Sequence, residues 1–522
     1  MKLVKWLSYS NYRLFDIFFT LFLFIGGVTV QANEEVPVNL PTPTLLESFD
    51  SMDGWTVNGG GIFRNVCPLA EGEAAMQVSG MGKELSYAIA QKPLAENINS
   101  GDMGVIVFAV KKTLPRVTSN LNVRLGTPGG AYTKVNYNIN VANLNSNSPL
   151  KTYWVAFHQS EDPLLSQSVD ISKIRIGSPA RNPPYLINNT IDALYANAKG
   201  QATVVIGFDD AEDTIASVAY PYMAQYDFSG TVYLPTQQIG WQNRLTWEQV
   251  TTLADAGWAI AVDGSPDDTN MTDAADVSTA VANAVSEWHD LEAHGLASDA
   301  MYHLCYPGGK FFDTSVRPVQ VTAMVSDGTN VVTLDGLYPI RTGMRVYGSN
   351  VPENTYVING GGDEVSSVTL SQNIPAQSLP AMFNDESGEF YLGKLPEALH
   401  KAGFKSGRIT VGGDMYTRFG FGGREMTTIG QGASYMTFNQ FLPLLNRVVL
   451  RGTTMETYFH RIVPDPAEGW TADTPNPGIN VYESFFKAYI DAVATRVQSG
   501  ELVVLTKPQW YERDIDNTVP AQ

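Results

Sequence analysis

Cysteine, histidine and basic residues are all scarce in this chain of 522 residues. Its two cysteines, Cys67 and Cys305, lie in different predicted domains and cannot build a disulfide framework. Lys and Arg number 34 against 53 Asp and Glu, which gives a formal net charge of -19. Such an acidic chain argues against nucleic acid as a partner. The charge also weakly disfavours polyanionic glycans, unless a local basic patch overrides the net value.

Long apolar runs are absent after residue 30. Lys2, Lys5 and Arg13 precede an apolar run at 17–30, and Val-Gln-Ala at 30–32 is a small-residue cleavage pattern. The run is short for a membrane span. We therefore expect residues 1–32 to be a signal peptide and the mature protein to be secreted, periplasmic or at the cell surface, without a membrane segment. An uncleaved anchor is the alternative.

Two regions have strand signals and no helical period. Residues 33–198 contain runs such as GVIVFAVKK between Gly, Asn, Ser and Pro turns. We expect a β-sandwich there, similar to the jelly rolls that accompany glycan-active enzymes. It is a possible carbohydrate-binding module or a cap, and we assign no binding residue to it. Residues 319–384 repeat the strand pattern and interrupt a domain formed by 199–318 and 385–522. This inserted β domain extends a substrate groove or makes oligomer contacts, and the sequence leaves both open.

A buried strand is predicted at the start of the interrupted domain. The run TVVIGF at 203–208 is β-branched and apolar, and it ends at Asp209 and Asp210. In α/β enzymes the residues after a strand lie at the carboxyl edge of the sheet, where the chemistry is placed. Neighbouring residues that leave a strand point in different directions, so one carboxylate can bind a metal while the other accepts a proton. A turn or a helix cap is the simpler alternative.

Helix and strand signals alternate after this pair. Residues 244–258 predict a helix with Thr246 as its cap, Gln249 three residues later and Gly257 as its stop. Three further apolar runs end in polar residues, in the turn at 263–272, at Tyr306 and at His460. Polar groups at four strand ends are typical of a barrel enzyme that assembles its site from distant segments.

The order of these segments resembles the polysaccharide deacetylases of the NodB-homology type, carbohydrate esterase family 4. The matching features are FDD after the first strand, the TWEQVTTLADAGW helix, an acidic turn, a YPGG turn and a late strand that ends in His. The resemblance implies a distorted (β/α) barrel and the removal of N- or O-acetyl groups from glycans. It also implies that Asp209 is the general base, Asp210 a metal ligand and His460 the general acid. Tyr306 would lie beside the acetyl group, with its backbone N–H helping to hold the developing oxyanion.

The acidic turn departs from the family, which has two metal-ligand histidines four residues apart at this place. This chain has Asp263 in the first position. Counting from the strand puts Asp267 in the second position, whereas counting back from the residues that follow puts Asp268 there. Together with Asp210, these carboxylates form a set that suits calcium, magnesium or manganese better than zinc. A degenerate domain without metal and a merely solvated turn are the alternatives.

Other polar residues near the strand ends have no assigned role. Arg408, Arg451 and Arg461 follow or end apolar runs and are candidates to pair with site carboxylates. His303 lies three residues before Tyr306, and we interpret it as a satisfied edge histidine rather than a site residue.

These observations predict a secreted esterase that deacetylates a polysaccharide with the help of a divalent cation. The main alternative is a glycan-binding or structural protein on a decayed esterase barrel. A third reading is a glycoside hydrolase or lyase, because those reactions also use paired carboxylates. The sequence does not indicate which glycan is bound, and it predicts no oligomeric state.

Overall fold

The computed structural model describes most of the chain after residue 39. The described ranges are 40–58, 61–66, 69–70, 72–81, 88–112, 120–133, 139–140, 152–178, 186–312, 318–348, 350–388, 394–466 and 474–515. The expected signal peptide at 1–32 and Cys67 lie outside them. No helix within these ranges is long and apolar enough to cross a membrane.

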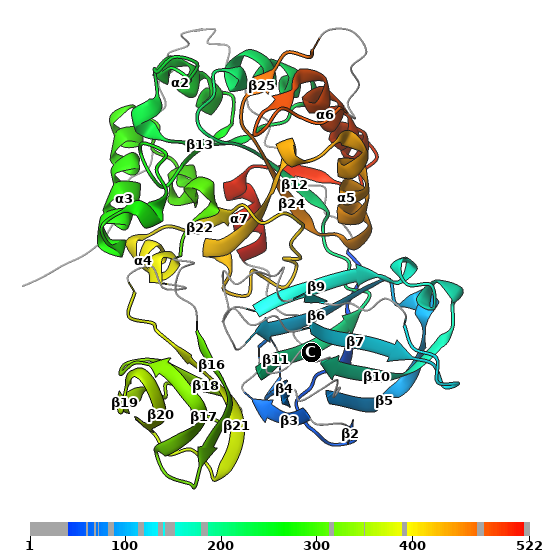
Figure 1. Cartoon of the computed structure of the whole chain (residues 1–522). Coiled ribbons are helices and arrows are strands. Elements are labelled where there is room, and N and C mark those ends of the chain that lie inside the picture. The colour runs from blue at the N-terminus through cyan, green and yellow to red at the C-terminus, as the bar shows by residue number, and fades with distance from the viewer. Residues whose placement is uncertain are drawn as a thin grey trace, which may run out of the picture. The chain divides into compact units, whose positions relative to one another are not determined.

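The first strands of the chain form two antiparallel sheets (Figure 1). One sheet has the order β3-β4-β11-β6-β9 with β1 paired to β11, and the other has the order β2-β5-β10-β7-β8. Side chains of both sheets, such as Phe108 and Ile174, meet in one buried cluster, so the sheets pack as a sandwich. The strands are β1 (Thr44–Glu47), β2 (Thr56–Asn58), β3 (Gly61–Val66), β4 (Ala75–Met81), β5 (Ala88–Asn99), β6 (Val105–Lys112), β7 (Asn120–Gly126), β8 (Ile139–Asn140), β9 (Thr152–His158), β10 (Asp170–Ser178) and β11 (Leu186–Ala196).

A closed parallel barrel follows the sandwich. Its strand order is β12-β13-β14-β15-β22-β23-β24, and β12 pairs with both β13 and β24, which closes the ring. β27 (Val503–Leu505) pairs with the first half of β12. The barrel predicted from the sequence is therefore confirmed. Its strands are β12 (Thr203–Phe208), β13 (Thr231–Leu234), β14 (Ala259–Val262), β15 (His303–Cys305), β22 (Ser406–Ile409), β23 (Thr428–Gly432) and β24 (Thr454–Phe459).

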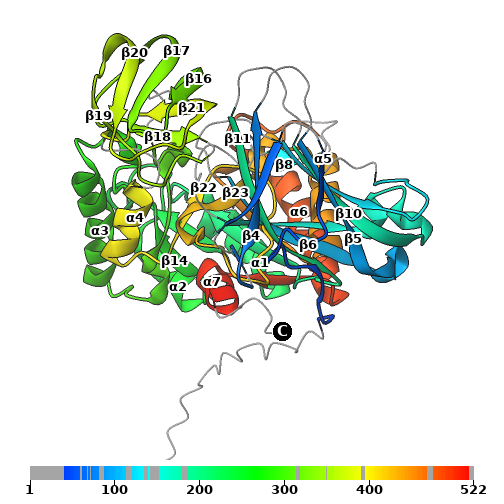
Figure 2. The same ribbon diagram turned by 90° about the horizontal axis from the view of Figure 1, so that it is seen from below.

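Alternate residues of the barrel strands point outward and inward. On β12, Val204, Ile206 and Phe208 belong to the large core that the surrounding helices share. The helices are α1 (Tyr220–Met223), α2 (Trp247–Asp255), α3 (Val277–Ala293), α4 (Lys394–Ala402), α5 (Phe438–Arg451), α6 (Glu483–Gln498) and α7 (Lys507–Ile515). Lys507 and Arg513 of α7 bond to the first residues of β13 and β12, so α7 covers the end of the barrel where the strands begin (Figure 2).

A separate β module interrupts the barrel between β15 and α4. Its sheet has the order β18-β21-β16-β17-β20-β19 and encloses its own apolar cluster. Its strands are β16 (Val319–Ser326), β17 (Val331–Ile340), β18 (Arg345–Gly348), β19 (Val357–Asn359), β20 (Gly362–Leu370) and β21 (Gln377–Asn384). A short parallel pair, β25 (Ile462–Val463) and β26 (Val481–Tyr482), follows β24.

Candidate active site

The barrel brings several of the predicted site residues to the edge where its strands end. Asp209 and Asp210 follow β12, Asp263 follows β14, and His460 follows β24. The His460 Nε2 atom lies 3.9 Å from an Oδ2 atom of each of Asp209 and Asp210. Two carboxylates and an imidazole from opposite ends of the domain sequence thus share one location.

Asp209 is held by Arg408, which points into the barrel from β22. One nitrogen of Arg408, Nη2, donates to both carboxylate oxygens of Asp209 at 2.6 Å. The guanidinium carbon lies 4.2 Å from the ring centre of Tyr458 and 5.0 Å from that of Tyr233. Because Arg408 is only 1% exposed and lies against two rings, it fixes the orientation of the Asp209 carboxylate.

Below this pair lies a buried ionic chain inside the barrel. Lys507 Nζ donates to Glu456 Oε2 at 2.6 Å, and Tyr233 donates its hydroxyl to Glu456 Oε1 at 2.6 Å. Arg408 Nε lies 3.8 Å from Glu456 Oε1. Two carboxylates, Asp209 and Glu456, therefore face two cations, Arg408 and Lys507. We call these four residues the interior charge network. Its formal charge is zero, as burial of ions requires.

The turn after β12 has an unusual backbone that basic side chains hold in place. Asp210 and Ala211 have φ of 60° and 51°, a region that residues with side chains seldom occupy. Arg244 donates to the carbonyl oxygen of Asp210 at 2.5 Å and to Glu212 Oε1 at 2.7 Å. Arg461 donates to Glu212 Oε2 at 3.0 Å. Such left-handed residues persist where the surroundings fix them, and they cluster at functional sites.

Asp263, in the first substituted histidine position, is almost fully buried. Its Oδ1 atom accepts the thiol hydrogen of Cys305 at 2.9 Å. Its Oδ2 atom is buried and has no hydrogen-bond partner among the described residues. Burial raises the pKa of the Asp263 carboxyl well above its usual range, and the nearby carboxylates of Glu287 and Asp268 add to this rise.

The two candidates for the second position have different surroundings. Asp267 accepts hydrogen bonds from Thr269 and Ser265 in its own turn, and these bonds lower its pKa. Asp268 is partly buried instead, and burial followed by the charge of Asp210 raises its pKa to about 6. Its side chain is therefore the one close to the other site carboxyls.

The donor set at this edge fits a hard divalent cation in its chemistry. Asp210, Asp263 and Asp268 offer carboxylate oxygens only, and the orphaned Oδ2 of Asp263 is an acceptor that lacks a partner. In the described part of the chain, no three His, Cys, Asp or Glu side chains already stand in an arrangement that holds a metal ion. The carboxyls are thus neighbours without being a ready-made coordination shell.

Tyr306 does not offer the backbone N–H that the resemblance implied. That N–H donates to the carbonyl oxygen of Arg408 at 2.9 Å, as part of the contact between β15 and β22. The phenol hydroxyl donates to the carbonyl oxygen of Met426 at 2.9 Å, and the side chain is buried in the core. Because both donors are already used, the geometry does not support an oxyanion role for Tyr306.

The remaining candidates separate clearly. Arg461 pairs with Glu212 in the turn after β12, whereas Arg451 pairs with Glu161. His303 is buried inside the barrel, with Nδ1 2.7 Å from Ser406 Oγ, but its Nε2 has no partner among the described residues. The expectation of a satisfied histidine therefore holds for one of its two nitrogens.

Three residues of the site region were not singled out from the sequence. Arg244 precedes the α2 helix, and Lys507 follows β27, so both lie outside the strand ends that carried the argument. Glu456 occupies the middle of β24. The charged residue in the run TMETYF could have indicated a buried ionic site, because side chains at inward positions fill the interior of a small barrel.

A parallel (β/α) barrel whose strand ends gather carboxylates and a histidine has the architecture of a barrel enzyme. Residues 196–325 match the family model described as polysaccharide deacetylase. The resemblance inferred from the sequence is confirmed for this segment, which contains β12 to β15 and the start of the inserted module.

Solved structures resemble parts of the chain. The Streptococcus pyogenes deacetylase PplD, in complex with acetate, is 21% identical over 21% of this chain and 48% of its own, with a TM-score of 0.20. The Xyl-CE4 domain of a multidomain xylanase from the hindgut metagenome of Trinervitermes trinervoides is 8% identical over 60% of this chain and 91% of its own, with a TM-score of 0.28. A family 11 carbohydrate-binding module of a Clostridium thermocellum cellulase is 14% identical over 30% of this chain and 94% of its own, with a TM-score of 0.23.

The chain thus spans about half the length of the S. pyogenes deacetylase that it matches. A comparison with curated proteins found no match. The TM-scores of these solved structures are too low to support an argument about function. The similarity to polysaccharide deacetylases therefore rests on the family match of residues 196–325, with the geometry of the site beside it.

Proposed function

We propose that this chain is a secreted carbohydrate esterase that removes acetyl groups from a polysaccharide by metal-assisted hydrolysis. One observation carries the proposal: Asp209 is clamped by Arg408 at the barrel edge, with His460 3.9 Å away. A fixed carboxylate beside an imidazole is what a base and an acid of acyl transfer require. The match of residues 196–325 to the polysaccharide deacetylase family supports the same reaction class.

Asp209 is the residue that accepts a proton from the attacking water. The new bond joins the water oxygen to the acetyl carbon, and the bond between that carbon and the sugar oxygen or nitrogen breaks. His460 donates the proton that the departing sugar atom needs, so the products are acetate and a free hydroxyl or amine. Arg408 does not touch the substrate in this scheme. It keeps the Asp209 oxygens facing the site.

Asp210, Asp263 and Asp268 are the residues that would hold the divalent cation. When bound, such an ion polarises an acetyl carbonyl and lowers the pKa of water. An oxygen-only donor set favours manganese, magnesium or calcium over zinc. Tyr306 has no part in the proposal, because its N–H is already bonded.

The test is acetate release from acetylated xylan and from chitin oligosaccharides. Asp209→Asn should lower turnover by about two to four orders of magnitude, because an amide cannot accept the proton. Asp267→Asn is the matched control, since the carboxylate of Asp267 accepts hydrogen bonds from Ser265 and Thr269 of its own turn, and this variant should keep full activity. Asn also leaves Arg408 without its carboxylate, so both variants are compared at a temperature where circular dichroism shows them folded.

Two outcomes would overturn the proposal. Full activity of Asp209→Asn would remove the base. New reducing ends or unsaturated ends without free acetate would identify a glycoside hydrolase or a lyase instead, and no product at all would favour a glycan-binding protein.

A further inference from the structure

Two exposed aromatic side chains lie on loops at the edge of the barrel where its strands end. Trp241 follows β13 and is 58% exposed, and Tyr435 follows β23 and is 68% exposed. No other Trp, Tyr or Phe side chain in the described ranges is as exposed. A single exposed apolar residue is ordinary on a protein surface, but apolar groups that gather around a polar site are typical of a ligand-binding groove.

The strand order of the barrel places these two residues on either side of the proposed base and acid. Around the ring, β13 is next to β12, β12 is next to β24, and β24 is next to β23. Asp209 follows β12 and His460 follows β24, so the strand ends that carry them lie between those that lead to Trp241 and Tyr435. Neighbouring strands lie about 4.8 Å apart, so three steps along the barrel wall span about 14 Å. This span is longer than one sugar ring.

Hydrogen bonds tie the loop of Trp241 to the turns on both sides of it. The Leu245 N–H donates to the carbonyl oxygen of Ala211 at 2.7 Å, in the turn after β12. The Gln237 N–H donates to the carbonyl oxygen of Pro266 at 2.8 Å, in the turn after β14. Because the loop is bonded at both of its ends, Trp241 is presented to solvent on a fixed backbone, and little ordering is left for a ligand to impose.

Tyr435 packs over a glycine beside the proposed acid. A Cβ added to Gly432 would lie 2.8 Å from Cδ2 of Tyr435 and 2.9 Å from the hydroxyl oxygen of Tyr458, so both side chains lie close to this residue. The ring centre of Tyr458 lies 5.9 Å from that of His460. Tyr435, Tyr458 and His460 therefore form a row of rings that leads from the exposed platform to the site.

The charge of this edge favours an uncharged ligand. The carboxyl groups of Asp210, Asp263 and Asp268 lie close enough to influence one another, and the formal net charge of the whole chain is -19. A chain of acidic sugars would bring further negative charge next to these carboxyls, and like charges repel. A sugar chain that carries only hydroxyl and acetyl groups avoids this repulsion.

We infer that Trp241 and Tyr435 are two stacking platforms for an uncharged polysaccharide whose pyranose rings have C–H groups on their faces. The flat rings of Trp and Tyr offer a large apolar contact area at a small loss of conformational freedom. The inference rests on the proposed function, since it places the reacting acetyl group between the two platforms. It adds that the substrate is a chain long enough to reach both of them, and not an acetylated monosaccharide.

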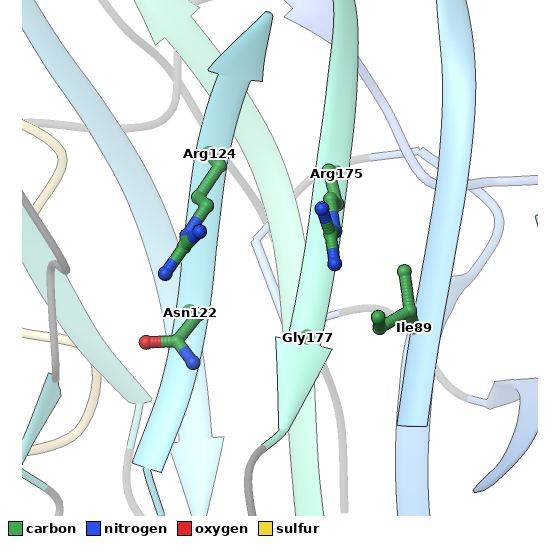
Figure 3. A pocket seen from close by; sticks show the side chains of 5 residues that line it. All are labelled: Ile89, Asn122, Arg124, Arg175 and Gly177. Carbon is green, nitrogen blue, oxygen red and sulfur yellow. The ribbon is translucent and has the colours of Figure 1, made fainter. Parts of the chain in front are cut away.

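The sandwich offers an alternative place for a sugar. A cavity of about 230 Å³ lies between strands β5, β10 and β7, and Figure 3 shows its lining residues Ile89, Asn122, Arg124, Arg175 and Gly177. All of them belong to the sandwich, so a ligand in this cavity would not depend on Trp241 or Tyr435. The variant Arg175→Ala therefore distinguishes binding in the cavity from binding at the barrel edge.

The experiment measures oligosaccharide binding by calorimetry, with the full-length chain carrying Asp209→Asn so that turnover is slow. The ligands are disaccharides and hexasaccharides of acetylated xylan and of chitin. We expect a hexasaccharide to bind about tenfold more tightly than the disaccharide of the same sugar, because only the longer chain reaches both rings. Trp241→Ala and Tyr435→Ala should each remove most of this difference. Trp241→Phe and Tyr435→Phe keep a ring at each place and should bind within about threefold of the starting protein.

Ile515→Ala is the matched control. Ile515 is also an exposed apolar residue of the barrel, at 48%, but it belongs to α7, which covers the opposite end. Ile515→Ala and Arg175→Ala should both leave binding unchanged. Because Trp241 and Tyr435 are exposed, their variants should also keep the melting curve of the starting protein, which separates loss of a platform from loss of the fold.

The inference is overturned if no hexasaccharide binds, if the hexasaccharide gains nothing over the disaccharide, or if the gain survives the loss of either ring. Tighter binding of polygalacturonate than of the uncharged chains, or loss of binding in Arg175→Ala, also overturns it. These measurements do not require acetate release, so they decide the inference whether or not the chain is an esterase. A wild-type protein that binds the hexasaccharide through both rings but releases no acetate would refute the proposed function alone.

Discussion

The interior charge network predicts that two charge-removing substitutions are less harmful together than apart. Lys507 and Glu456 are both 0% exposed, and their charged atoms lie 2.6 Å apart. Lys507→Met leaves Glu456 with only Arg408 at 3.8 Å and the Tyr233 hydroxyl as partners. Glu456→Gln leaves the ammonium of Lys507 without a carboxylate. In each variant one buried charge loses its counterion, because Arg408 and Asp209 already balance each other.

Breaking one side of a buried ion pair destabilises a protein by about 3–5 kcal/mol. Lys507→Met should fall near the lower limit, since Arg408 compensates part of the charge of Glu456. Glu456→Gln should fall near the upper limit. The double variant replaces both charges by uncharged groups of similar size. Replacing a buried ion pair in this way often changes the free energy of unfolding little. Its loss should therefore be smaller than the sum of the two single losses by about 2 kcal/mol or more.

The chain has several separate cores, so a single unfolding transition is not assured. Hydrogen exchange of the β24 amides reports the opening of the barrel itself, and the change in their protection gives the free-energy difference for each variant. The reasoning would be refuted if the protection loss of the double variant equalled the sum of the two single losses within about 0.5 kcal/mol. Lys507 and Glu456 would then act independently. Thr246→Ala, a helix cap at the barrel surface, is the control that should add normally to either substitution.

Three further results follow from the structure. His460→Ala should lower acetate release by about two to four orders of magnitude while metal analysis shows an unchanged content, and loss of the metal would make His460 a ligand instead. Chelation should abolish activity, and manganese, magnesium or calcium should restore it as well as zinc does. The restoration should occur in the wild type and in Asp267→Ala but not in Asp268→Ala. Rescue of Asp268→Ala would contradict the choice of Asp268 as the residue that holds the cation. Gly452→Ala should lower the melting temperature of the barrel, because Gly452 has φ of +68° and a Cβ there would collide with the carbonyl of Gly200; an unchanged melting temperature would contradict that close approach.

Local signals in the sequence predicted the parts of the barrel that depend on neighbouring residues. Thr246 and Gln249 form the expected capping box, since the Thr246 hydroxyl accepts from the Gln249 N–H and the Gln249 side chain accepts from the Thr246 N–H. The strand before Asp209 is fully buried along its length, as its apolar run indicated. These features arise within a few residues, so they leave a trace in the order of the amino acids.

The partners of the site residues depend on strand pairing and could not be predicted in the same way. Arg408 lies 199 residues from Asp209 in sequence, and it reaches Asp209 because β22 follows β15 in the ring after the inserted module. The choice between Asp267 and Asp268 as the second site carboxyl depended on the conformation of the turn. The side chain of Asp267 bonds to Ser265 and Thr269 within the turn, whereas that of Asp268 is close to Asp210. Tyr306 was assigned an oxyanion role from a motif, but the register of β15 against β22 uses its N–H within the barrel wall.

The proposed cation also bears on the charge balance at this edge of the barrel, where carboxylates stand in place of histidines. The interior charge network is already neutral, although the charge of Arg408 still opposes part of the pKa rise of Asp210. Asp210 and Asp268 are approached by Arg244 and His460, and these are the cations that oppose the pKa rise of both. Asp263 has no basic group among the causes of its raised pKa. The edge therefore carries more carboxyl groups than bases. The divalent ion of the proposed function would supply positive charge there, whereas an imidazole pair in the same positions would bring no negative charge that needed compensation.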